Sequence, residues 1–169
     1  AVAATCTKTG LTQGSHCSVC GTVITAQKTV AEKAHTYKTY TTKATTSKNG
    51  SIVTKCSVCG SVKSKSTIYY PKTITLSTTS YTYNGSVKKP TVKVVGSNGK
   101  TISSSNYTVT YASGRKNVGK YAVKITFKGN YSGTKTLTFK INPISVSKCK
   151  ITLSTTSYTY NGKVKKPTV

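Results

Sequence analysis

Acidic side chains are almost absent from this sequence. Its 169 residues include 26 lysines and arginines but one acid, Glu32, and the formal net charge is +25. With a single carboxylate, neither the paired acids of a glycosidase nor a Ser-His-Asp triad can be assembled. The one Cys-His neighbour pair, His16 and Cys17, lies in a metal-type cysteine motif. The composition therefore predicts a protein that is not an enzyme.

Long apolar runs and helix-forming residues are also scarce. No stretch of 18 apolar residues occurs, so no membrane span is predicted. Met and Trp are absent, whereas threonine, serine and tyrosine are abundant. This composition favours strands and turns with a solvent-facing surface. We therefore expect an all-β fold.

The positive charge is spread along the chain and does not form one block. Lysines recur every few residues within segments rich in threonine, serine and tyrosine. Such spacing is typical of solvated strand faces, where lysine also discourages edge-to-edge pairing. The excess charge equally favours anionic partners, namely nucleic acid, teichoic acid or acidic glycans of a cell wall or host.

Residues 73–143 carry the strongest strand signals. In "KYAVKITFK", which starts at Lys120, apolar and aromatic side chains alternate with lysine, threonine and alanine. "TLTFKI" and "YTVTY" alternate in the same way. This period of two is typical of antiparallel strands with one dry face and one wet face. The side chains predicted to point inward are Tyr107, Val109, Tyr111, Tyr121, Val123, Ile125, Phe127, Leu137, Phe139 and Ile141.

Turn signals divide this region into six or seven short strands. Asn84-Gly85 and Asn98-Gly99 are dipeptides that accept positive φ in tight turns. The strand spacing predicts an immunoglobulin-like antiparallel β-sandwich over residues 72–144. "NVGKY", from Asn117 to Tyr121, resembles the tyrosine corner of immunoglobulin domains with Asn in place of Asp. In that motif the tyrosine hydroxyl bonds back to the nearby backbone.

The end of the chain repeats the start of this domain. "ITLSTTSYTYNGKVKKPTV" at 151–169 matches residues 74–92 at an offset of 77, apart from Lys163 in place of Ser86. Residues 145–169 are therefore predicted to be a linker and a partial second repeat. Such a half-unit needs the rest of a longer array, or a neighbouring subunit that accepts its strands. The residues predicted to make strand exchange are Ile151, Leu153, Tyr158, Tyr160 and Val164.

The first 71 residues contain a second, shorter repeat. Cys-Ser-Val-Cys-Gly occurs at 17–21 and again at 56–60. The segments around each copy read as strand, glycine turn, strand, cysteine knuckle and strand. We predict two small three-stranded cysteine-knuckle modules, at 1–34 and 35–71. Neither is large enough to bury much core alone.

Two C-x-x-C-G knuckles in one chain indicate a metal site, most simply structural zinc. In one arrangement Cys17, Cys20, Cys56 and Cys59 share one ion. In the other, each module has its own site, and the first would use Cys6, Cys17, Cys20 and His35. The second module has Thr46 in place of Cys6, so its own set would lack a ligand.

Disulfide bonds in an oxidising compartment are the rival interpretation of the same cysteines. In that case Cys149, alone in the linker, would pair with Cys6, Cys56 or Cys59, or with another chain. Free thiol titration with and without reductant and chelator separates zinc from disulfides.

Several phrases resemble tandem immunoglobulin-like repeats of large surface and secreted proteins of gut Firmicutes. They include "ATCTKTGLTQGSHCSVCG", "TLSTTSYTYNGKVKKPTV" and "FKGNYSGTKTLTFKINP", and the likeness spans nearly the whole chain. The resemblance implies an extracellular or cell-surface bacterial β-protein whose modules act as spacers, stalks or adhesive arrays. It implies no catalytic residue. Where relatives often carry acids at turns, this chain has Gln13, Asn49 and Asn98.

These observations favour a non-enzymatic extracellular structural repeat protein: a stalk, an adhesin segment or a self-associating filament subunit. Strand exchange through 151–169 is a specific form of this hypothesis. The alternative is a cationic module that binds anionic polymers. A zinc-ribbon nucleic-acid protein is a third possibility, which the immunoglobulin-like half disfavours.

Overall fold

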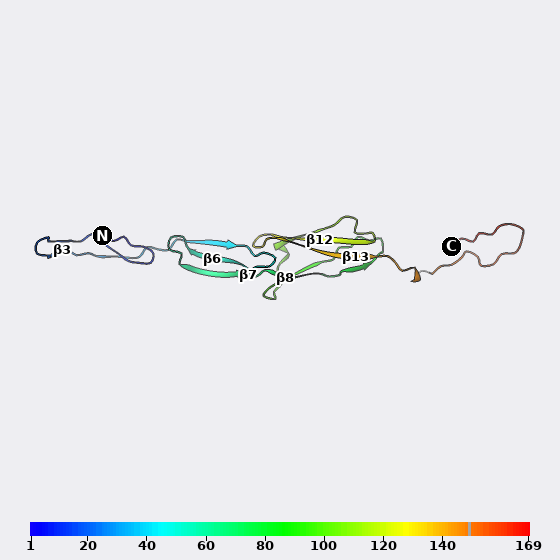
Figure 1. The fold of residues 1–169 in the computed structure, drawn as a ribbon, viewed down its shortest axis with the longest axis horizontal. Helices are drawn as coiled ribbons and strands as arrows, with labels where there is room; N and C mark the ends of the chain where they lie inside the picture. The colour runs from blue at the N-terminus through cyan, green and yellow to red at the C-terminus, as the bar shows by residue number, and fades with distance from the viewer. Residues whose placement is uncertain (149) are drawn as a thin grey trace.

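The computed structural model describes residues 1–148 and 150–169, and its regular structure is almost entirely β. The all-β prediction is confirmed. Figure 1 shows an elongated molecule in which successive stretches of the chain follow one another along its length. The first cysteine knuckle and the segment after residue 150 lie at opposite ends. Two short 3₁₀ turns, η1 (Ser104–Asn106) and η2 (Val146–Lys148), are the helical elements of the described residues.

The first module consists of two short antiparallel pairs. β1 (Gly10–Leu11) pairs with β4 (Thr29–Val30), and β2 (Ser15–His16) pairs with β3 (Val23–Thr25). This differs from the single three-stranded sheet that we expected. None of the residues of β2, β3 and β4 is buried. Hydrogen bonds therefore hold these strands, most of them between backbones, and no shared apolar face aligns them into one sheet.

The second module forms the predicted three-stranded antiparallel sheet. Its strands are β5 (Tyr37–Thr42), β6 (Gly50–Cys56) and β7 (Val62–Ile68), in the order β5-β6-β7. Gly50 begins the central strand and is buried. A Cβ at this position would collide with the backbone of Thr42 and Ala44. The close approach therefore requires glycine.

Residues 71–142, the sandwich-like region, form two sheets around one core. β8 (Pro71–Leu76) pairs with β10 (Val92–Gly96). The four-stranded sheet has the order β11-β12-β13-β9. Its strands are β9 (Ser80–Thr82), β11 (Tyr107–Tyr111), β12 (Gly119–Phe127) and β13 (Thr134–Asn142).

One strand pairing differs from the expected antiparallel arrangement. β9 runs parallel to β13, with Ile141 opposite Tyr81. The chain leaves the two-stranded sheet after β8 and joins the edge of the other sheet in the direction of β13. The alternation within each strand predicts its faces but not this change of sheet.

The core lies between the two sheets, and the predicted inward faces are confirmed. Val123 and Ile125 of β12 are fully buried, and Phe139 and Ile141 of β13 are nearly so. Val94 of β10 packs into the same cluster from the smaller sheet. The other buried members are Ile102, Tyr107 and Phe127; Val109, Tyr111, Tyr121 and Leu137 pack against them partly exposed.

The predicted tyrosine corner is present. The hydroxyl of Tyr121 donates a hydrogen bond to the carbonyl oxygen of Asn117 at 2.9 Å. The Asn-Gly turns also form as expected, with φ of 73° at Gly85 and 78° at Gly99. Local sequence therefore fixes how β12 begins and how two of the turns close.

Two groups of hydrogen bonds join the second module to the sandwich-like region. Ala44 is fully buried, its N–H donates to the Asn130 carbonyl at 3.0 Å, and its carbonyl accepts from the Ser132 N–H at 2.9 Å. The Ser97 N–H donates to the Tyr70 carbonyl at 2.9 Å, and the Ser97 hydroxyl donates to the Asn49 side-chain oxygen at 3.1 Å. This joint is therefore made largely of backbone contacts.

The last segment keeps the local bonding of the copy that it repeats. The Ser154 N–H donates to the Thr168 carbonyl at 2.8 Å, as Ser77 N–H does to Thr91 at 2.9 Å. No regular strand is formed among residues 150–169. Cys149 lies outside the described residues, so its predicted role stays a prediction.

Candidate metal centre

Four potential metal ligands meet where the two knuckle modules join. They are Cys6, His35, Cys56 and Cys59, and their ligand atoms all lie within 4.8 Å of one another. Cys6 comes from the first module, where it lies in a tight turn closed by the bond from the Thr5 N–H to the Lys8 carbonyl at 2.9 Å. Cys56 ends β6, and Cys59 lies in the knuckle after it. Cys6 and Cys56 are buried, His35 is partly exposed and Cys59 lies at the surface.

Two distances between ligand atoms of this cluster are close to those of a tetrahedral metal site. The sulfur atoms of Cys6 and Cys56 are 3.9 Å apart, and Cys59 Sγ is 3.4 Å from His35 Nδ1. Zinc bonds of about 2.3 Å to sulfur and about 2.0–2.1 Å to nitrogen, at tetrahedral angles, place S and S about 3.8 Å apart and S and N about 3.5 Å apart. The three sulfurs and one nitrogen can therefore hold one such ion.

The knuckle turns the backbone so that Cys56 and Cys59 face the same side. The Cys56 N–H donates to the Ser61 carbonyl at 2.8 Å, and the Gly60 N–H donates back to the Cys56 carbonyl at 3.0 Å. Gly60 has φ of 77°, which side chains other than glycine rarely adopt. The terminal glycine of C-x-x-C-G thus permits the turn that positions the two thiols.

The cluster holds one thiol ready to ionise and another that resists ionisation. Backbone N–H groups of Cys59 and Val58, followed by the His35 ring, lower the pKa of Cys56 to about 5. The pKa of Cys6 is raised to about 11, first by its hydrogen bond with Cys59, then by burial and by Cys56. A cation that enters the site neutralises the thiolates and displaces the remaining thiol protons.

The structure unites four of the six predicted ligands in a combination that neither predicted arrangement contained. Cys56 and Cys59 do not meet Cys17 and Cys20, and Cys6 and His35 join the knuckle of the following module. The substitution of Thr46 for Cys6 in the second module is the sequence signal of this sharing. It indicated that a module does not complete its own ligand set.

The five described cysteines are free thiols. The sulfurs of Cys6 and Cys56 are 3.9 Å apart, well beyond the bond length of about 2.05 Å in a disulfide. The cysteine geometry thus fits metal coordination and does not show the predicted alternative of disulfide pairing among these residues.

The first knuckle has the same local geometry but lies apart from the cluster. The Cys17 N–H donates to Thr22 at 2.8 Å, the Gly21 N–H donates to Cys17 at 2.9 Å, and Gly21 has φ of 73°. Cys20 is exposed, and its sulfur lies 3.2 Å from the Thr22 hydroxyl. That hydroxyl and nearby backbone N–H groups lower the pKa of Cys20 to about 7.

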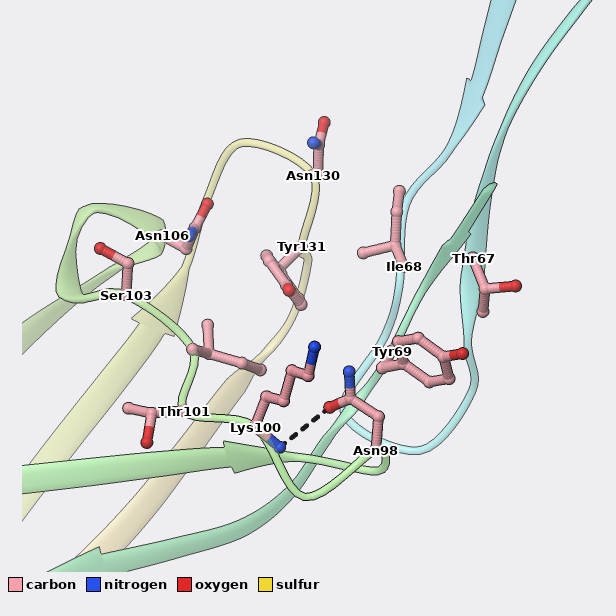
Figure 2. A pocket seen from close by; sticks show the side chains of 11 residues that line it. Thr67, Ile68, Tyr69, Asn98, Lys100, Thr101, Ser103, Asn106, Asn130 and Tyr131 are labelled. Atoms are coloured by element: carbon pink, nitrogen blue, oxygen red, sulfur yellow. Dashed lines mark hydrogen bonds between the residues drawn. The ribbon is translucent and has the colours of Figure 1, made fainter. Parts of the chain in front are cut away.

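A shallow pocket of about 350 Å³ lies at the other joint, between β7 and the loops of the sandwich-like region. Figure 2 shows polar side chains around it, with the Lys100 N–H bonded to the Asn98 side-chain oxygen at 3.1 Å. Its lining includes no acid, histidine or cysteine. The pocket therefore offers neither a metal ligand set nor an acid–base pair.

No protein-family model matches the chain, and neither a curated protein nor a solved structure matches it significantly. Among the described residues no helix has the length and apolar character needed to cross a bilayer.

Proposed function

We propose that this chain is a non-enzymatic extracellular structural repeat protein, in which bound zinc clamps successive knuckle modules end to end. It acts as a stalk, an adhesin segment or a filament subunit. The observation that carries this proposal is the origin of the ligands: Cys6 belongs to one module, and Cys56 and Cys59 belong to the next. A metal at this point ties two units that bury little core of their own.

The zinc assignment follows from the type of the four donors. Three sulfurs and one imidazole nitrogen, with no oxygen ligand, suit zinc better than calcium, magnesium or manganese. All four positions of the tetrahedron are taken by protein atoms. Such closed sites are typical of structural zinc and leave no open position for a substrate.

The surroundings of the cluster support a mechanical role. The Lys33 N–H donates to the Thr5 carbonyl at 2.9 Å, so a backbone bond within the first module holds the segment before His35 beside the turn that carries Cys6. The second joint carries the bonds of Ala44 and Asn49 described above. The elongated arrangement in Figure 1 is what a spacer requires. The resemblance to gut Firmicutes surface repeats favours the extracellular location.

The rigidity of the metal joint provides the test. Two fluorophores are attached through encoded azide side chains at Val19, which is 94 % exposed, and at exposed Lys65. We expect a narrow distance distribution with zinc and a broad one after chelation. The distance distribution of a Cys6→Ser variant should stay broad when zinc is added, whereas that of a Cys17→Ser variant should become as narrow as in the wild type. An equally narrow distribution with and without zinc would contradict the clamp.

Strand exchange through 151–169 is the form of self-association that the repeat supports. In the first copy, the counterparts of Ile151, Leu153 and Tyr158 are Ile74, Leu76 and Tyr81, which pack against the core. In the second copy these three side chains are 72 %, 47 % and 46 % exposed. We propose that a neighbouring subunit covers them.

The same comparison separates the five predicted exchange residues into two groups. The counterparts of Tyr160 and Val164 are Tyr83 and Val87, which are themselves 36 % and 59 % exposed. Replacing Ile151 and Leu153 by serine should therefore reduce filament formation, as seen by electron microscopy. Replacing Tyr160 and Val164 by serine should have little effect. Filaments that survive deletion of 151–169 would exclude strand exchange.

A second candidate function, binding of anionic polymers, is favoured by opposed lysines. Lys120 lies directly opposite Lys140 between β12 and β13, and Lys38 lies opposite Lys55 between β5 and β6. Like charges at such positions destabilise a sheet. With one acid for 26 basic residues, neutralisation within the chain is scarce. A polyanion along these strands would relieve the repulsion.

Inorganic polyphosphate is a suitable probe of this candidate. Its affinity should fall steeply as salt rises, because binding releases counterions. Lys120→Gln with Lys140→Gln should weaken binding and its salt dependence more than Lys48→Gln with Lys163→Gln, which also removes two charges. Equal effects of the two double variants would leave only non-specific attraction.

A further inference from the structure

The knuckle at Cys17–Cys20 is a structural copy of the knuckle that supplies half of the metal cluster. The two motifs are identical in sequence and are separated by 39 residues. Their turn hydrogen bonds agree within 0.1 Å, at 2.8 and 2.9 Å in the first and 2.8 and 3.0 Å in the second. The glycine φ angles are 73° and 77°. The first knuckle therefore presents two thiols in the arrangement that the second uses.

The partners of the second knuckle come from its amino-terminal side. Cys6 and His35 both precede Cys56 in the chain, and Cys6 belongs to the preceding module. These two residues cannot also serve Cys17 and Cys20, because they are already part of the described cluster. Figure 1 shows the first knuckle at the far end of the molecule, next to β3 and away from that cluster.

We infer that Cys17 and Cys20 are one half of a second metal site, which is completed by a cysteine and a histidine from another module of the same kind docked onto this end. The inference rests on the proposed zinc-clamped joint and extends it to an interaction surface. Each module then offers a knuckle at one end and, where it carries a Cys6-type residue, a thiol for the next knuckle at the other.

The residue aligned with Cys6 in the second module supports this order, in which a thiol serves the knuckle of the following module. Gly10 and Gly50 occupy equivalent places, since a Cβ at Gly10 would meet the backbone of Val2 and Ala4 as one at Gly50 would meet Thr42 and Ala44. This alignment puts Thr46 in the place of Cys6. Thr46 faces no knuckle; its methyl carbon would lie 3.2 Å from a Cβ added at Gly133 of the sandwich-like region. The thiol is thus found where another knuckle module follows and is missing where the sandwich-like region follows.

A chain with residues 1–40 duplicated ahead of Ala1 tests the inference. The added copy supplies a Cys6 and a His35 at spacings from the original Cys17 that agree within one residue with those of the described cluster from Cys56. Cobalt(II) titration, read from the thiolate charge-transfer and d–d absorption bands, then counts tight sites. We expect one in the natural chain and two in the duplicated chain. Cys17→Ser with Cys20→Ser in the original copy should restore a count of one.

Alkylation mapped by mass spectrometry provides a second readout that also reports folding of the added copy. With zinc present, Cys17 and Cys20 of the natural chain should react while Cys56 and Cys59 are protected. In the duplicated chain the original Cys17 and Cys20 should become protected. A duplicated chain that binds one cobalt and leaves both thiols reactive would overturn the inference while the joint itself stands. A natural chain that binds no cobalt would instead refute the zinc joint, and the inference with it.

Discussion

At the scale of single residues, the chemistry of this chain is concentrated in its thiols. With one carboxylate, cysteine is the main side chain that can become a strong anionic ligand. The knuckle backbone favours the thiolate at Cys56, whereas hydrogen bonds with Cys59 and Cys56, together with burial, keep the Cys6 thiol protonated. The two thiols differ because one receives N–H donors and the other faces sulfur.

Zinc affinity should therefore rise with pH across the neutral range. Cys56 is ionised above a pKa of about 5, but the proton of Cys6, with a pKa of about 11, must be displaced at every pH in this range. Each displaced proton should lower the apparent Kd about tenfold per pH unit. Competition titrations with a chromophoric chelator at pH 6, 7 and 8 measure this slope. An affinity that is constant from pH 6 to 8 would contradict displacement of a thiol proton.

The corner tyrosine gives a residue-scale prediction outside the metal site. Tyr121→Phe removes the bond from its hydroxyl to Asn117 and keeps the ring. We expect the free energy of unfolding of this region to fall by about 0.5–1.5 kcal/mol. Urea unfolding followed by tyrosine fluorescence measures it. Tyr160→Phe, at a position that is 92 % exposed, is the matched control and should change nothing. An equal loss in both variants would remove the corner as the cause.

At the scale of elements, glycine decides whether β6 can form against its neighbour. Gly50→Ala places a methyl group into the backbone of Thr42 and Ala44, which are not flexible side-chain ends. We expect a loss of about 1–3 kcal/mol or more in thermal or urea unfolding of the second module. Ser51→Ala, one residue along the same strand, adds no such clash and serves as control. Comparable stability of Gly50→Ala and wild type would show that the backbone yields here.

The strands of the core region were predictable, because one wet and one dry face impose a period of two. Val123, Ile125 and Phe139 were assigned inward on this basis, and all are buried. The parallel pairing of β9 with β13 was not predictable, since it depends on where the chain crosses between sheets. Sequence also singled out Cys6 as a candidate ligand, but it did not pair Cys6 with Cys56 and Cys59 of the next module. Spacing within a module carries no information about such contacts.

At the scale of the whole molecule, each joint uses a residue that lies inside the same kind of tight turn, closed by Thr5 and Lys8 in one module and by Thr45 and Lys48 in the other. Cys6 meets the next knuckle, whereas Thr46 lies against the sandwich-like region. Ala4 and Ala44, two residues earlier, are both buried. One local structure is thus adapted to two kinds of neighbour by a single residue type. This adaptation is what an extended chain of modules requires if its joints are to resist bending.

X-ray absorption at the zinc edge tests the central claim most directly. The zinc-loaded chain should show three sulfurs at about 2.3 Å and one nitrogen at about 2.0–2.1 Å. Cys6→Ser should lose one sulfur or the metal itself, and Cys17→Ser with Cys20→Ser should leave the spectrum unchanged. A shell of four sulfurs that is lost in the Cys17→Ser, Cys20→Ser variant would instead place the ion between the two knuckles and contradict the joint described here.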